Sequence, residues 1–189
     1  MVRLILSAAM AAVAMLVAGF IFFASPLNGI GTRTLGDEQA AQMQASLKQI
    51  IPATGTYAVP NPDTAAQTVM YGGGPVATVH FNASGYAAGD ATMLLWGLAL
   101  NFITALLAGL GLLALGGRAS DFPSRARLVV LLAAGASLYI HLGRALYLHH
   151  DLTNVLFTMV GDGLALALGG LVVAWFLPSP APSGAITHK

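Results

Sequence analysis

The chain has 189 residues, of which 57% are hydrophobic and only 8% are charged. This composition is typical of a bilayer protein, and it excludes an ordinary soluble domain, a disordered chain and a nucleic-acid-binding protein. The formal net charge of +1 indicates no particular partner, and the absence of cysteine excludes disulfides, Cys-ligated iron–sulfur clusters and covalently attached c-type haem.

Four long apolar runs account for most of the sequence. Each is long enough to cross the hydrocarbon core of a bilayer, roughly 30 Å, as a helix. The runs cover residues 4–24, 91–117, 128–148 and 155–177. We therefore predict an all-α membrane protein, a bundle of four transmembrane helices.

The first run has two interpretations. Met-Val-Arg followed by an apolar stretch is the usual opening of a cleavable signal peptide. The apolar run is longer than the usual signal core, however, so we predict that residues 1–25 are retained as the first transmembrane helix.

Residues 26–90 follow the first helix and are expected to form a small extracytoplasmic α+β domain. Asp37 and Glu38 favour the start of a short amphipathic helix over residues 37–51, because carboxylates stabilise the positive end of the helix dipole. Pro52 should end that helix.

Two strands are predicted in the same segment. Residues 56–59 are rich in β-forming types, and residues 76–81 alternate between apolar and polar side chains. We expect the two strands to pair, with a possible short element at residues 64–71 in their connection. The last three helices then follow over residues 91–177.

Each long apolar run carries small or polar residues spaced three or four positions apart, which places them on one face of a helix. Small residues let helix backbones approach closely, and this supplies packing that hydrophobicity cannot supply between helices in lipid. We therefore predict a compact bundle. The four stripes are Ser7, Ala11, Ala14 and Ala18; Gly97, Asn101, Thr104 and Ala108; Ser137, His141 and Arg144; and Thr158, Asp162, Ala165 and Gly169.

Four of these stripe residues form a candidate intramembrane polar cluster: Asn101, His141, Arg144 and Asp162. At about 1.5 Å of rise per residue, Asn101, His141 and Asp162 are expected at similar depths and Arg144 one turn nearer the outer surface, so the four could meet. A charged group facing lipid costs at least ~2.5 kcal/mol, so we expect Arg144 and Asp162 to face inward and pair.

The polar cluster has three interpretations. The leading one is structural, in which the ion pair and its polar neighbours lock the hairpin of the last two helices. The second is a proton-responsive or ligand-binding site, because a histidine near a carboxylate can change protonation at physiological pH. The third is that the four side chains do not meet.

His149, His150 and Asp151 are expected to form a polar cap at the membrane surface, where the last two helices connect. Two axial haem ligands usually come from facing helices, whereas His141, His149 and His150 lie on or just beyond one helix. We therefore predict no cofactor and no metal in the single chain. Haem or quinone at a junction with another subunit is an alternative.

Basic residues indicate the orientation, because cytoplasmic segments of membrane proteins carry an excess of lysine and arginine. Arg3 precedes the first run, Arg118, Arg125 and Arg127 flank the second connection, and Lys189 ends the chain. We predict that both termini are cytoplasmic. Residues 178–189, rich in Pro and Ser, are expected to be a flexible cytoplasmic tail.

Several short motifs occur in a characteristic order. They are Leu-Gly-Asp-Glu at 35–38, Pro-Ala-Thr-Gly-Thr-Tyr at 52–57 and Gly-Gly-Pro at 73–75, followed by three more helices. In this order the chain resembles uncharacterised bacterial four-helix inner-membrane proteins with a small periplasmic domain after the first helix. The resemblance implies the bacterial inner membrane, and it brings no activity and no functional residues.

The sequence contains no pattern of a nucleophile with its base and no metal-ligand spacing. We therefore expect a non-enzymatic accessory or scaffold subunit of a membrane complex, whose partners are the lipid bilayer and other membrane-protein subunits or a second copy. The alternative is a small channel, transporter or proton-linked redox subunit that uses the polar cluster. A lipid-modifying enzyme with an acid and base at residues 149–151 is a third class, but no nucleophile marks it.

Overall fold

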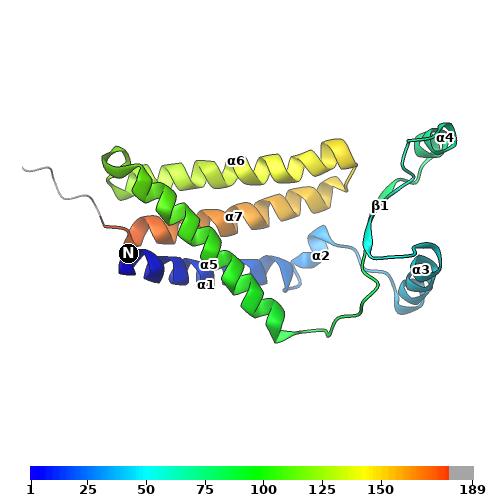
Figure 1. Ribbon diagram of the computed structural model, residues 1–189, viewed down its shortest axis with the longest axis horizontal. Helices are drawn as coiled ribbons and strands as arrows, with labels where there is room; N and C mark the ends of the chain where they lie inside the picture. Colours follow the sequence, from blue (N-terminus) through cyan, green and yellow to red (C-terminus); the bar gives the residue numbers. More distant parts are fainter. Residues whose placement is uncertain (179–189) are drawn as a thin grey trace, which may run out of the picture. The chain divides into compact units, whose positions relative to one another are not determined.

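The computed structural model describes residues 1–178 and is mostly helical (Figure 1). Four of its helices are long and apolar enough to cross a membrane, as predicted. They are α1 (Val2–Phe23), α5 (Ala91–Ala114), α6 (Phe122–Leu148) and α7 (Leu152–Phe176). The expected flexible tail lies outside the described residues, apart from Pro178.

The last two helices begin several residues before their apolar runs, because aspartates cap their first turns. The carboxylate of Asp121 accepts from the backbone N–H of Ser124 at 3.4 Å, and α6 starts at Phe122. The carboxylate of Asp151 accepts from the backbone N–H of Asn154 at 2.8 Å, and α7 starts at Leu152. Each cap satisfies a donor that has no partner within its helix.

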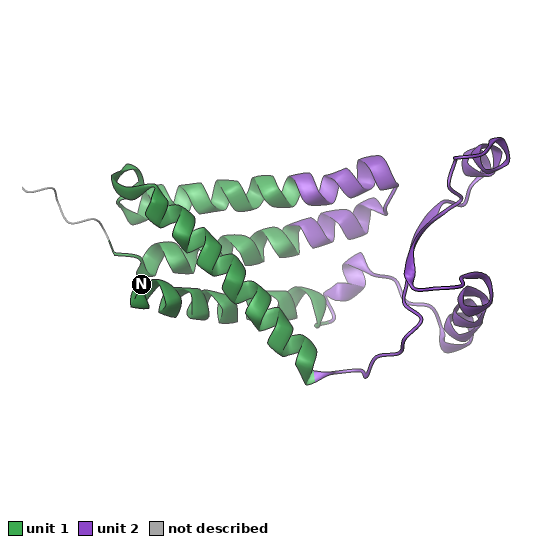
Figure 2. Ribbon diagram, viewed as in Figure 1, with its two compact units in different colours: residues 1–25, 91–138, 160–189 green, residues 26–90, 139–159 purple. Residues whose placement is uncertain are grey.

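The described chain divides into two compact units, which Figure 2 colours separately. Unit 1 contains Met1–Ser25, Ala91–Leu138 and the chain from Val160 onward, and unit 2 contains Pro26–Asp90 and Tyr139–Met159. Unit 1 therefore holds α1, α5 and large parts of α6 and α7. Unit 2 holds the segment between α1 and α5 together with the connected ends of α6 and α7.

Close helix packing forms the core of unit 1. A Cβ at Gly170 of α7 would lie 2.8 Å from the Cβ of Val129 on α6, so only glycine fits at this approach. A Cβ at Gly109 of α5 would similarly overlap Leu4 of α1. The buried core residues, all on the four helices except Leu177 just after α7, are Leu4, Ala8, Ala11, Met15, Ala105, Leu112, Val129, Val173, Ala174 and Leu177.

The tightly packed face of α5 differs from the predicted stripe. Ala105, Gly109 and Leu112 are buried, whereas Asn101 and Ala108 of the predicted row are only half-buried. Both rows have helical spacing, so periodicity alone does not distinguish them. The deciding factor is Gly109, which has no side chain to obstruct Leu4.

Unit 2 contains the predicted pair of strands. β1 (Gly55–Val59) and β2 (Ala77–Phe81) pair antiparallel, with Thr56 opposite His80. The predicted amphipathic helix is α3 (Asp37–Ile50), and the possible short element is α4 (Ala65–Gly73). A further short helix that was not predicted, α2 (Asn28–Gly31), follows α1.

Candidate functional site

A buried polar contact in unit 2 joins the ends of α6 and α7. His141 of α6 is only 4% exposed, and its Nδ1 lies 3.2 Å from the hydroxyl oxygen of Thr158 on α7. The same hydroxyl lies 2.8 Å from the carbonyl oxygen of Asn154, one turn earlier. A buried polar ring between apolar helices thus has a partner on the facing helix.

The number of protons available in this contact indicates which nitrogen of the His141 ring is protonated. A hydroxyl has one proton to donate. If Thr158 donates it to the carbonyl of Asn154, the hydroxyl can only accept from His141, whose Nδ1 must then carry a proton. The geometry therefore favours the histidine as donor through Nδ1.

A second contact fixes α2 to the first turn of α7. The side-chain amide of Asn154 donates to the carbonyl oxygen of Gly31 at 2.9 Å. A Cβ at Gly31 would lie only 2.7 Å from the Cγ of Phe157, so glycine permits the approach. Asn154 and Gly31 did not stand out in the sequence, because an isolated Asn or Gly carries no periodic signal.

His149, His150 and Asp151 form the connection between the two helices. His149 has φ of 53°, and the N–H of His150 donates to the carbonyl oxygen of Arg144 at 3.2 Å. This is the left-handed end of a helix at which glycine is usual. The ring of His149 packs edge-on against Tyr71 of α4, with ring centroids 5.9 Å apart.

A shallow cavity of about 260 Å³ adjoins this connection. It lies between the start of β2, at Ala77 and Thr78, and the three connecting residues. Nε2 of His150 is buried and has no hydrogen-bond partner among the described residues. Within residues 1–178, no three His, Asp or Glu side chains are arranged to hold a metal ion.

The structure places the four residues of the predicted intramembrane cluster differently. His141 and Arg144 belong to unit 2, whereas Asn101 and Asp162 belong to unit 1 and are half-buried. Arg144 is exposed and lies one turn before the end of α6, whereas an inward orientation was expected. The pairing of Arg144 with Asp162 stays a prediction.

Asp162 lies beside a close approach of α6 and α7 in unit 1. A Cβ at the neighbouring Gly163 would lie 3.3 Å from the hydroxyl oxygen of Ser137, which is 3% exposed. Asp162 is thus next in sequence to a residue that contacts α6, and its own side chain is half-buried.

Arg125 has a role that the sequence did not reveal. It is 5% exposed, and its guanidinium donates three hydrogen bonds of 2.8 to 2.9 Å. The acceptors are the carbonyl oxygens of Ala119, Leu177 and Pro178. These bonds tie the start of α6 to the end of α7, where carbonyls lack helical partners. The sequence had indicated only a basic connection.

The chain was compared with protein-family models, curated proteins and solved structures, and none of them matches it.

Proposed function

We propose that the protein is a multi-pass protein of the bacterial inner membrane, with both termini in the cytoplasm. It acts as a non-enzymatic accessory subunit that binds another membrane protein through α3 and α4. The observation that carries this proposal is that neither α3 nor α4 buries a single residue in the described chain.

The apolar side chains of these helices are open to contact. On α3, Met43 is 53% and Ile50 is 77% exposed, and on α4, Val69 is 77% and Met70 is 54% exposed. Exposed apolar groups gathered on short helices are a common feature of protein-binding surfaces. A bound partner would remove them from water and stabilise the complex by burying apolar area.

A protein partner fits these helices better than the membrane surface. Amphipathic helices that bind anionic membranes have polar faces rich in lysine and arginine. α3 carries Asp37 and Glu38 against the single Lys48, and α4 has no charged residue. Electrostatic attraction to anionic lipid is therefore missing, while apolar contact with a protein needs no such charge.

The test starts with carbonate extraction of membranes, in which the proposed integral protein should remain in the pellet. The chain is then purified in mild detergent at native expression, and associated proteins are identified by mass spectrometry. We expect the natural chain to copurify with a stoichiometric partner protein. The double variant Met43→Glu, Ile50→Glu should be recovered without that partner.

The matched control places the same two charges on the polar face of α3. Gln42→Glu with Gln49→Glu should retain the partner, because helical spacing turns both positions away from Met43 and Ile50. Retention of the partner by the apolar-face variant would contradict the proposal. A preparation that contains only copies of this chain would also contradict it.

The second candidate function is a small channel, transporter or proton-linked redox subunit that uses the polar cluster. It is favoured by the burial of His141 between apolar helices, since an intramembrane histidine can carry a proton. Asp162→Asn separates the two functions. Loss of an assigned activity with a normal yield of folded protein supports the second function, and unchanged activity supports a structural cluster.

A further inference from the structure

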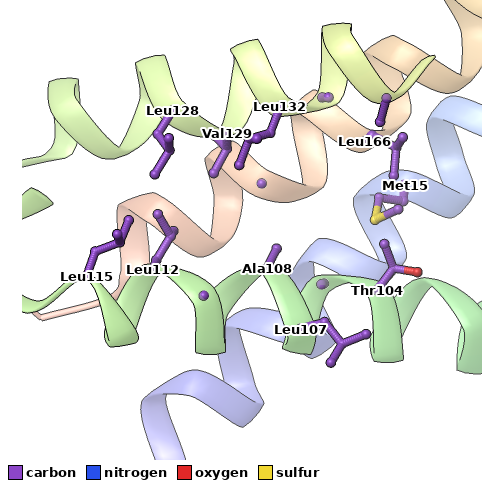
Figure 3. Close-up of a pocket in the computed structure, with 15 residues that line it drawn as sticks. Met15, Thr104, Leu107, Ala108, Leu112, Leu115, Leu128, Val129, Leu132 and Leu166 are labelled. Atoms are coloured by element: carbon purple, nitrogen blue, oxygen red, sulfur yellow. The ribbon is translucent and has the colours of Figure 1, made fainter. Parts of the chain in front are cut away.

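Unit 1 contains an apolar groove of about 500 Å³ between α5 and α6 (Figure 3). Leu112 of α5 and Leu115, which directly follows α5, face Leu128 and Leu132 of α6 across it. Among the 15 residues that line the groove, Thr104 alone has a polar side chain. Such a groove binds hydrocarbon and offers little to a polar ligand.

The size of the groove matches one hydrocarbon chain. An apolar cavity of about 150 Å³ accommodates benzene, which has six carbons. By proportion a groove of about 500 Å³ accommodates on the order of twenty carbons. This is close to one acyl chain of a membrane phospholipid.

Positive charge gathers at one end of the groove. Leu115 lines that end, and the exposed Arg118 follows it by three residues in the short helix η1 (Gly116–Ala119). Arg125 precedes the lining residue Leu128 by three positions on α6. Its three bonds to carbonyl oxygens leave its charge uncancelled, because these acceptors are neutral.

We propose that the groove binds one acyl chain of an anionic phospholipid, whose phosphate interacts with Arg118. The apolar lining selects the chain, and the cationic end selects the charge of the headgroup, as basic sites between transmembrane helices do on the cytoplasmic side. The inference rests on the membrane location proposed above. It does not depend on the partner of α3 and α4.

One pair of variants tests the apolar part of the site. A Cβ at Gly111, which lines the groove on α5, would meet nothing within 4 Å. Gly111→Leu should therefore fill the groove without disturbing the helices. Gly135 of α6 has equally open space and does not line the groove, so Gly135→Leu is the matched control.

A second pair tests the charged part. Arg118→Glu reverses the charge at the end of the groove. Arg127→Glu makes the same change at an exposed position of α6, where helical spacing turns it away from the groove face of Leu128 to Ala136. Arg118→Gln removes the charge without reversing it, and it serves if the Glu variant folds poorly.

The experiment titrates the purified full-length chain with dioleoyl phosphatidylglycerol or dioleoyl phosphatidylcholine and measures binding by native mass spectrometry. The two lipids share their acyl chains, so a difference in affinity reports on the headgroup. We expect the natural chain to prefer the anionic lipid by about fivefold, the effect of one basic residue near a membrane surface. Arg118→Glu should weaken binding of the anionic lipid by about 25-fold, and Gly111→Leu should weaken binding of both lipids. Both control variants should behave as the natural chain.

Three results would overturn the proposal. Equal affinity of the natural chain for the two lipids would show that charge does not select the headgroup. Unchanged lipid binding by Gly111→Leu would show that the groove is not the binding site. A dimer of the natural chain that Gly111→Leu dissociates, without a change in lipid binding, would assign the groove to a second copy. Release of the protein by carbonate is a separate result, which would refute the membrane location itself.

Discussion

The close approach of α6 and α7 at Gly170 should make that position intolerant of a single methyl group. An alanine Cβ there would lie 2.8 Å from the Cβ of Val129 and 3.1 Å from its Cγ2. Carbon atoms pack best at about 3.5–4.0 Å, and the Cβ of Val129 cannot rotate away because it is fixed to the helix backbone. α6 and α7 must therefore move apart along this contact.

The magnitude follows from two opposing effects. Overpacking of a core costs about 1–3 kcal/mol, while exchange of glycine for alanine within a helix returns up to about 1 kcal/mol. At Gly135 of α6 an added Cβ meets nothing within 4 Å, so Gly135→Ala has only the favourable effect. The free energies of unfolding of the two variants should differ by about 1–3 kcal/mol, since the helix-propensity gain cancels in the comparison.

Reversible unfolding by sodium dodecyl sulfate in mixed micelles, followed by circular dichroism, measures this difference. We expect Gly170→Ala to unfold at a lower mole fraction of the denaturing detergent than Gly135→Ala. Equal midpoints, or a more stable Gly170→Ala, would show that the helices absorb the methyl group without separating. The packing argument would then be wrong.

Three further predictions concern polar groups. Arg125→Ala should lower the yield of folded protein in fluorescence-detected size exclusion, because three carbonyl oxygens lose a charged donor, each such bond being worth about 1.5–3 kcal/mol; a normal yield would refute this. Hydrogen bonding by the side chain of Ser124, with a smaller effect of its backbone N–H, lowers the pKa of Asp121 below its usual 3.8. The contribution of Asp121 to stability is therefore present above that pH and is lost as the pH falls through the lowered pKa. Asp121→Asn should therefore make the midpoint of thermal unfolding less dependent on pH in the acidic range. An unchanged pH dependence would contradict the hydrogen bonding of Asp121 with Ser124. Thr158→Val should cost about 1 kcal/mol in the same micelle assay, because the hydrogen bond between Thr158 and His141 is lost, and no change would show that the bond is not stabilising.

Predictions from local periodicity were confirmed for the secondary structure. The four long helices follow from runs of apolar residues, and the paired strands follow from alternation at 76–81. These patterns depend only on neighbours in the chain, so they can be seen without knowing the fold. The helix ends were less predictable, because the capping carboxylates of Asp121 and Asp151 lie outside the apolar runs.

The candidate site was predictable only in part. Helical spacing correctly placed Ser137 on a buried face of α6, and His141 is buried one turn later. The same spacing placed Arg144 on that face, yet the residue is exposed. Spacing gives the direction in which a side chain leaves the helix, but a flexible side chain near a helix end can reach polar surroundings from either face.

The four long apolar helices, the position of the small sheet and the basic segments could be predicted from the sequence alone. Three contacts are visible only in the folded chain: Gly109 of α5 lies against Leu4 of α1, Thr158 hydrogen-bonds with His141, and Arg125 joins α6 to the end of α7. The physical reason is that these contacts depend on the rotation of each helix about its axis. That rotation results from the packing of several helices together, and no single stretch of the chain contains it.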